Sequence, residues 1–110
     1  MFGFSLFPKD VSVQEAAEKL GAEGHLLLDV RTRGEVQMMG IKGALNIPLD
    51  RLEGSLDQLR GYSSIHIICQ TGNRSSYATQ MLHALGLTQA ENVAGGIVTW
   101  VRAGLPTTRG

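Results

Sequence analysis

The chain has a single cysteine, Cys69, and its position favours a reactive thiol. Cys69 follows the apolar run 65–68 and begins the loop 69–75, which leads into a helical pattern. At the start of a helix, unpaired backbone N–H groups and the positive end of the helix dipole stabilise an anion. Such surroundings lower a cysteine pKa from about 8.5 to roughly 3.5–7.5. The sequence therefore predicts a nucleophilic thiolate at Cys69.

The residues after Cys69 favour this interpretation over a buried structural cysteine, which is the usual state of a free thiol. Gly72 permits unusual backbone angles, and Arg74 adds a permanent cation. A short loop that curls around its first side chain directs successive N–H groups inward, as an anion-binding nest. We expect residues 70–75 to form such a nest around the sulfur. The candidate binding residues are Gln70, Thr71, Gly72, Asn73, Arg74 and Ser75.

The length of this loop limits what it can enclose. Cys69 and Arg74 have four residues between them, one fewer than the Cys-x5-Arg loop of cysteine-dependent phosphatases. Such phosphatases must surround a whole phosphoryl group, so the shorter loop favours a smaller guest, such as one extra sulfur atom on Cys69. A phosphatase or an arsenate reductase using the same thiolate is a distant alternative.

Composition narrows the class of protein. At 110 residues and 43% hydrophobic content, the chain suits one domain over residues 1–110. Ten basic residues balance ten acidic ones without a basic block, which argues against nucleic acid or an anionic membrane as partner. One cysteine cannot form an internal disulfide, which fits a reducing, cytoplasmic location. The three histidines share no ligand spacing with Cys69, so we expect neither a metal nor another cofactor.

Strands and helices alternate along the chain. Apolar runs predict strands at 1–7, 26–30, 44–47, 65–69 and 90–93, and capping or helical spacing predicts helices beginning at Ser12, Thr32, Asp50, Ser75 and Ile97. Strands joined by helices pair in parallel, so we expect an α/β fold: a small, mainly parallel sheet with helices on both faces. Ligands of such sheets bind beyond the carboxyl ends of the strands, where Asp29 and Cys69 both fall.

Five segments in this order resemble a single-domain rhodanese, a sulfurtransferase. They are Leu28-Asp29-Val30-Arg31 with Glu35 after it, Gly43-Ala44-Leu45-Asn46-Ile47-Pro48, the loop 69–75, Gly95-Gly96-Ile97 through Trp100, and Gly104-Leu105-Pro106. Two positions depart from the family pattern. Met39-Gly40-Ile41 stands where relatives often have Gly-His-Ile, and Gln70 stands where thiosulfate-directed relatives often have a basic residue. Thiosulfate is therefore expected to be a poor substrate.

The resemblance implies a rhodanese-like fold and a reaction. Cys69 would take sulfur from a small donor such as thiosulfate or a persulfide, hold it as a cysteine persulfide, and pass it to cyanide, a thiol or a protein acceptor. For Asp29, Arg31 and Glu35 themselves, a structural charge network that fastens the strand end to the loops is favoured over a direct role in proton transfer. The resemblance adds a pairing of Glu35 with Arg74. The alternative is a rhodanese-like module that carries sulfur or binds a protein without turnover.

Overall fold

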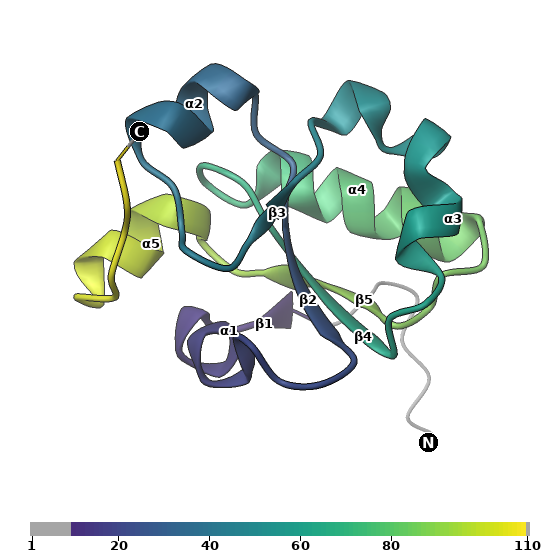
Figure 1. Ribbon diagram of the computed structural model, residues 1–110, viewed down its shortest axis with the longest axis horizontal. Coiled ribbons are helices and arrows are strands. Elements are labelled where there is room, and N and C mark those ends of the chain that lie inside the picture. Colours follow the sequence, from purple (N-terminus) through teal and green to yellow (C-terminus); the bar gives the residue numbers. More distant parts are fainter. Residues whose placement is uncertain (1–9, 110) are drawn as a thin grey trace.

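The computed structural model describes residues 10–109 and shows an α/β fold, as predicted (Figure 1). The strands are β1 (Asp10–Val11), β2 (His25–Asp29), β3 (Leu45–Asn46), β4 (Ser64–Ile68) and β5 (Ala90–Val93). The helices are α1 (Val13–Lys19), α2 (Arg33–Met38), α3 (Leu56–Leu59), α4 (Asn73–Ala84) and α5 (Gly96–Arg102), with the short 3-10 helices η1 (Leu49–Arg51) and η2 (Glu53–Ser55) before α3. The edge strand expected at residues 1–7 lies outside the described residues.

The described strands form one parallel sheet in the order β1-β5-β4-β2-β3. In its register, Asp29 at the end of β2 lies beside Ile68 at the end of β4 and beside Asn46 of β3. The backbone N–H of Val30 donates to the carbonyl of Ile68 at 3.1 Å, so the chain stays paired just past both strand ends. This register brings the segments that follow β2 and β4 to one edge of the sheet.

Side chains of the central strands alternate between two apolar clusters, which explains the continuous apolar runs in the sequence. Ile65 and Ile67 pack in the cluster beneath α3 and α4, whereas Leu27 and Ile68 pack in the cluster beneath α1 and α5. Figure 1 shows these two pairs of helices on opposite sides of the sheet. The predicted helical layers on both faces are therefore confirmed.

Capping spacing predicted helix starts at Ser12, Thr32 and Asp50, and the capping boxes at Ser12 and Thr32 are present. The hydroxyl of Ser12 accepts from the amide of Glu15 at 3.0 Å, and the Glu15 carboxylate accepts from the amide of Ser12 at 3.1 Å. Thr32 and Glu35 make the same reciprocal pair at the start of α2. Local spacing alone determines such motifs, which is why the sequence reveals them.

The third predicted helix start, at Asp50, is wrong. Asp50 lies inside η1, after Pro48, and its side chain caps nothing. The chain instead makes two 3-10 turns, with the Arg51 amide donating to the Pro48 carbonyl at 2.8 Å, and the regular helix α3 begins only at Leu56. Gly54 inside this segment weakens a continuous α-helix, so the tighter turns replace it. No helix within residues 10–109 has both the length and the apolar character to cross a membrane.

Candidate active site

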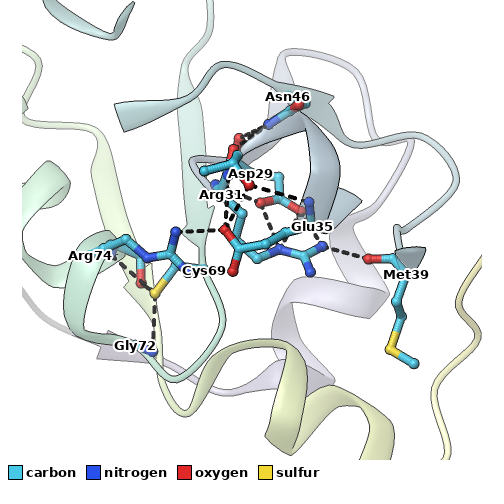
Figure 2. Close-up of polar contacts among 10 residues, drawn as sticks. Asp29, Arg31, Glu35, Met39, Asn46, Cys69, Gly72 and Arg74 are labelled. Carbon is cyan, nitrogen blue, oxygen red and sulfur yellow. Dashed lines mark hydrogen bonds and ion pairs between the residues drawn. The ribbon is translucent and has the colours of Figure 1, made fainter. Parts of the chain in front are cut away.

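The sulfur of Cys69 is the focus of three hydrogen bonds at the carboxyl edge of the sheet (Figure 2). Its Sγ accepts from the backbone N–H of Gly72 at 3.1 Å, from the backbone N–H of Ser75 at 3.3 Å, and from the Ser75 hydroxyl at 3.2 Å. The side chain is almost fully buried, with 1% of the residue exposed. The thiol is therefore enclosed, but enclosed by donors as well as by hydrocarbon.

The sulfur takes the place of a helix cap. At α1 and α2 a hydroxyl receives the free amides of the first turn, but α4 has Gly72 at its N-cap and no side-chain cap. Cys69 Sγ accepts from the N-cap residue and from Ser75 in the first turn, so the sulfur satisfies donors that would otherwise be unpaired. Gly72 makes this possible because its φ of 105° is favourable only for glycine.

These contacts determine the direction in which the pKa of the Cys69 thiol is shifted. Burial raises the pKa of Cys69, but the hydroxyl and amide of Ser75 and the amides of Gly72 and Thr71 together outweigh it. The net result is a pKa below the ordinary cysteine value. Donors that bond to the charged form favour it, and the positive end of α4 acts in the same direction.

A second helix holds the other side of the loop. The backbone N–H of Ile97 donates to the Cys69 carbonyl at 2.9 Å, and that of Val98 donates to the Gln70 carbonyl at 3.1 Å. These first-turn amides of α5 bind the two loop carbonyls and so hold the backbone at the start of the loop in place. Two helix N-termini thus converge on the loop, one at the sulfur and one at the backbone behind it.

This clamp depends on Gly96, which the sequence placed only in one of the five segments that resemble the family. Its φ is 62°, and a Cβ atom there would lie 2.5 Å from the carbonyl oxygens of both Cys69 and Gln70. Only glycine allows α5 to approach the loop so closely. The paired glycines before a helix were the available signal, but the partner of that turn is far away in the sequence.

Arg74 points away from the sulfur and toward α2. Its guanidinium makes a bidentate ion pair with Glu35, with Nη1–Oε1 at 2.7 Å and Nη2–Oε2 at 2.8 Å (Figure 2). Arg74 is the main cause that lowers the pKa of Glu35 to about 2, and the pKa of Arg74 is raised in turn. The pairing expected from the family resemblance is confirmed. It ties the loop to the capping box of α2.

Asp29 and Arg31 form a second, fully buried ion pair at 2.7 Å. The Arg31 guanidinium also donates to the carbonyl of Met39 at 2.8 Å, just past the end of α2. The amide of Asn46 donates to the backbone carbonyls of Asp29 and Arg31, both at 2.9 Å. Asp29 and Arg31 thus belong to one buried network, which includes Asn46, a residue that the sequence placed only in a matching segment. Glu35 forms a separate pair with Arg74.

The nest predicted from residues 70–75 is narrower around the sulfur than expected. In the described part of the chain, the amides of Gln70, Asn73 and Arg74 make no hydrogen bond to Sγ. The side chains of Thr71 and Asn73 are exposed. The sequence predicted that α4 begins at Ser75, but the helix begins two residues earlier, at Asn73.

No group of His, Cys, Asp and Glu within residues 10–109 has the arrangement of a metal site.

Comparison with known proteins places this geometry in a family. A family model described as rhodanese-like domain matches residues 12–103. Thiosulfate sulfurtransferase 16, chloroplastic, of Arabidopsis thaliana is 36% identical over 116 residues, covering 94% of this chain and 95% of that protein. Adenylyltransferase and sulfurtransferase MOCS3-1 of Zea mays is 37% identical over 94 residues, covering 77% of this chain. The match spans only 20% of the length of that maize protein.

Comparison of the fold with solved structures identifies the same family. The crystal structure of a rhodanese-related protein from Thermoplasma volcanium superposes with a TM-score of 0.81 at 30% sequence identity, covering 91% of this chain and 97% of the other. The resemblance that the five sequence segments suggested is thus confirmed over nearly the whole described length. The chain belongs to the family of rhodanese-like domains.

Proposed function

We propose that this chain is a sulfurtransferase that works through a persulfide on Cys69. The thiolate attacks the outer sulfur of a donor, the sulfur–donor bond breaks, and the rest of the donor leaves with the electron pair. An acceptor, either cyanide or a thiolate, then attacks the outer sulfur of the persulfide. Cys69 leaves as a thiolate and is ready for the next cycle, so the two half-reactions follow a ping-pong order.

The observation that carries this proposal is the convergence of Gly72 and Ser75 on a sulfur whose pKa is lowered. None of these donors is a base. A thiolate that is already formed needs no base to activate it, because the anion is itself the nucleophile. The same donors stabilise Cys69 as the leaving group in the second half-reaction, since a low thiol pKa favours departure.

The start of α4 offers donors for the transferred sulfur. The amides of Asn73 and Arg74 belong to the first turn, which has no intrahelical partners. We assign them to the outer sulfur of the persulfide, whose negative charge the helix dipole would also stabilise. Residues 70–75 would then bind the cargo, whereas Asp29, Arg31 and Glu35 would hold the loop in place without contacting it.

The charges around the loop influence which sulfur donor the protein accepts. Arg31 and Arg74 are each paired with a carboxylate, and Gln70 is neutral. Little net positive charge is left to attract a dianion, so we expect an organic persulfide to be a better donor than thiosulfate. The similarity to Thiosulfate sulfurtransferase 16 supports thiosulfate as at least a slow donor.

The direct test compares wild-type protein with Cys69→Ser, using thiosulfate and an organic persulfide as donors and cyanide and a thiol as acceptors. We expect transfer by the wild type alone, with mass spectrometry showing one added sulfur on the peptide that contains Cys69. Circular dichroism would verify that the variant is folded. Sulfur transfer by folded Cys69→Ser would disprove the proposal.

A module that carries sulfur without turnover is the second candidate. Its support is the similarity to the maize protein, in which the matched region is a small part of a longer chain. The same experiment separates the two functions. A carrier would gain one sulfur at Cys69 but release none to cyanide or to any thiol, whereas an enzyme would lose it to the acceptor and reload.

A further inference from the structure

A groove of about 480 Å³ borders the active loop and runs along α4. One wall is made by Arg74, Tyr77 and Met81, which lie at intervals of three and four residues and so share one face of the helix. At a rise of 1.5 Å per residue, this wall extends for about 10 Å from the first turn of α4. The groove therefore meets the loop that holds Cys69 at Arg74 and continues away from it along α4, while Cys69 itself does not line it.

The opposite wall comes from the segments that follow β2 and β3. The amide of Leu49 donates to the carbonyl of Val30 at 3.1 Å, which fixes these two apolar residues side by side. Pro48 extends the same wall, and Tyr77 across the groove is 60% exposed. A large exposed aromatic side chain in a groove lined by aliphatic residues suits the apolar body of an organic ligand.

The charge of the groove is negative. Asp50 and Glu53 line it, both are exposed, and neither has an ion-pair partner within residues 10–109. Arg74, the one cation of the lining, is already neutralised by the bidentate contact with Glu35. An occupant with a positive group would be attracted, whereas an anion would be repelled.

We infer that this groove receives the sulfur acceptor, and that the acceptor is an organic thiol with an apolar body and a protonated amine. The inference rests on the proposed function and specifies its second half-reaction. A volume of about 480 Å³ lies within the range of pockets for small organic ligands and far exceeds the needs of cyanide. The amine would lie near Asp50 and Glu53, and the apolar part against Tyr77.

The chemical step is balanced without any further reactant. The acceptor thiol loses its proton to solvent, and its sulfur attacks the outer sulfur of the Cys69 persulfide. The S–S bond at Cys69 breaks, and Cys69 keeps the electron pair as a thiolate. The acceptor leaves the groove as a persulfide.

A kinetic test uses two short acceptors of opposite charge, cysteamine and 3-mercaptopropionate, with one donor held constant. We expect the wild type to have the lower KM for cysteamine. The double variant Asp50→Asn/Glu53→Gln should raise that KM about three- to tenfold, since each exposed charge contact contributes little alone. Its kcat, and its rate of loading with sulfur, should stay unchanged.

The matched control is Glu18→Gln/Glu23→Gln, which removes two exposed carboxylates, from α1 and from the turn before β2, outside this groove. This control should keep the wild-type preference for cysteamine. An equal change in both double variants would mean that overall charge, and not the groove, sets the preference. Equal KM values for the two acceptors in the wild type would likewise overturn the inference.

A binding measurement separates failure of the inference from failure of the proposed function. Cys69→Ser protein is titrated with 4-phenylbutylamine or with 4-phenylbutyrate, and the amide signals are followed by NMR. We expect the amine alone to shift the signals of Glu53 and Tyr77. If these shifts occur but the wild-type protein transfers no sulfur from any donor, the proposed function is rejected and the groove remains a site for cationic ligands. Equal shifts with both compounds, or shifts elsewhere, would reject the groove.

Discussion

Cys69 follows β4 at the carboxyl edge of the sheet, and His66 lies in the same strand three residues earlier, on the opposite face. Both are buried, with 1% and 3% of the residue exposed. Cys69 has three hydrogen-bond donors on its sulfur, whereas the Nδ1 atom of His66 is buried without a hydrogen-bond partner. The ring of His66 instead meets that of His25 edge to face, at 4.3 Å between centroids.

Burial favours the neutral form of both groups, but the outcomes differ. At Cys69 the donors outweigh burial, so the pKa falls and the thiolate is favoured. At His66 burial is the largest cause of a lowered pKa, so the imidazole stays neutral. The pKa of His25 is lowered in the same way, to about 4, with burial as the largest cause. Equal burial thus has opposite effects on the charged forms because donors at the N-terminus of α4 are already directed at the sulfur, whereas the Nδ1 atom of His66 has no partner.

The largest effect is expected from Gly96→Ala, which breaks the clamp behind the loop. The added Cβ would lie 2.5 Å from two carbonyl oxygens, and alanine is strained at a φ of 62°. We expect a loss of about 1–3 kcal/mol in unfolding free energy, measured by denaturant titration, together with a raised pKa at Cys69. Gly54→Ala is the control, because nothing lies within 4 Å of its Cβ position. Equal stability of the two variants would show that α5 does not constrain the loop.

A smaller effect is expected from Ser75→Ala, which removes one donor and makes Cys69 more like His66. The lost hydroxyl lies 3.2 Å from Sγ, so the thiol pKa should rise by about one unit. The rate of alkylation as a function of pH measures this shift. Ser76→Ala is the matched control, since its hydroxyl makes no hydrogen bond to the sulfur. An unchanged pKa in Ser75→Ala would exclude the hydroxyl as a source of stabilisation.

Acidification should lower the stability of the folded protein, because protonation of Glu35 removes its ion pair with Arg74 at the carboxyl edge of the sheet. Its pKa is about 2 in the folded protein against an ordinary 4.5, so the unfolded chain binds the proton first as the pH falls. The stability from the pair with Arg74 is complete above about 4.5 and is lost toward about 2. Glu35→Gln should therefore be less stable than the wild type by a few degrees in Tm at neutral pH, and the two should converge at low pH. A constant difference down to low pH would contradict this.

The smallest effect is expected from the two buried histidines. They lower the stability of the folded protein in a higher pH range than Glu35 does. A lowered pKa means that the unfolded chain binds protons from about 6.5 downward, whereas folded His25 does so only near 4. Stability is therefore lost as the pH falls from about 6.5 toward 4. His66→Phe removes one of these groups and should lose less stability over that range, measured by urea titration at each pH. An equal loss in variant and wild type would show that His66 is not excluded from protonation.

Much of the carboxyl edge could be predicted because its signals are local. The capping boxes at Ser12 and Thr32 are set by residues three apart, and the apolar run before Cys69 fixes the strand that presents it. The pair between Glu35 and Arg74 came from the family resemblance, since nothing near either residue indicates a partner 39 positions away.

The features that sequence reasoning missed depend on contacts between distant segments. The donation from Ile97 and Val98 to the loop arises only when α5 packs beneath the sheet. The contact between His25 and His66 depends on the parallel register of β2 and β4, which sets Leu27 beside His66. The failed helix start at Asp50 has a local cause, because Pro48 and Gly54 favour tight turns over the capping spacing.

The most direct test of this account is the pKa of Cys69 in the wild-type protein. Because the chain has one cysteine, the pH dependence of its alkylation by iodoacetamide reports that thiol alone. The convergence of donors from Gly72 and Ser75 predicts a midpoint below the ordinary value of about 8.5. A midpoint at or above that value would mean that burial outweighs the donors, and it would contradict the claim that the fold lowers the pKa of Cys69.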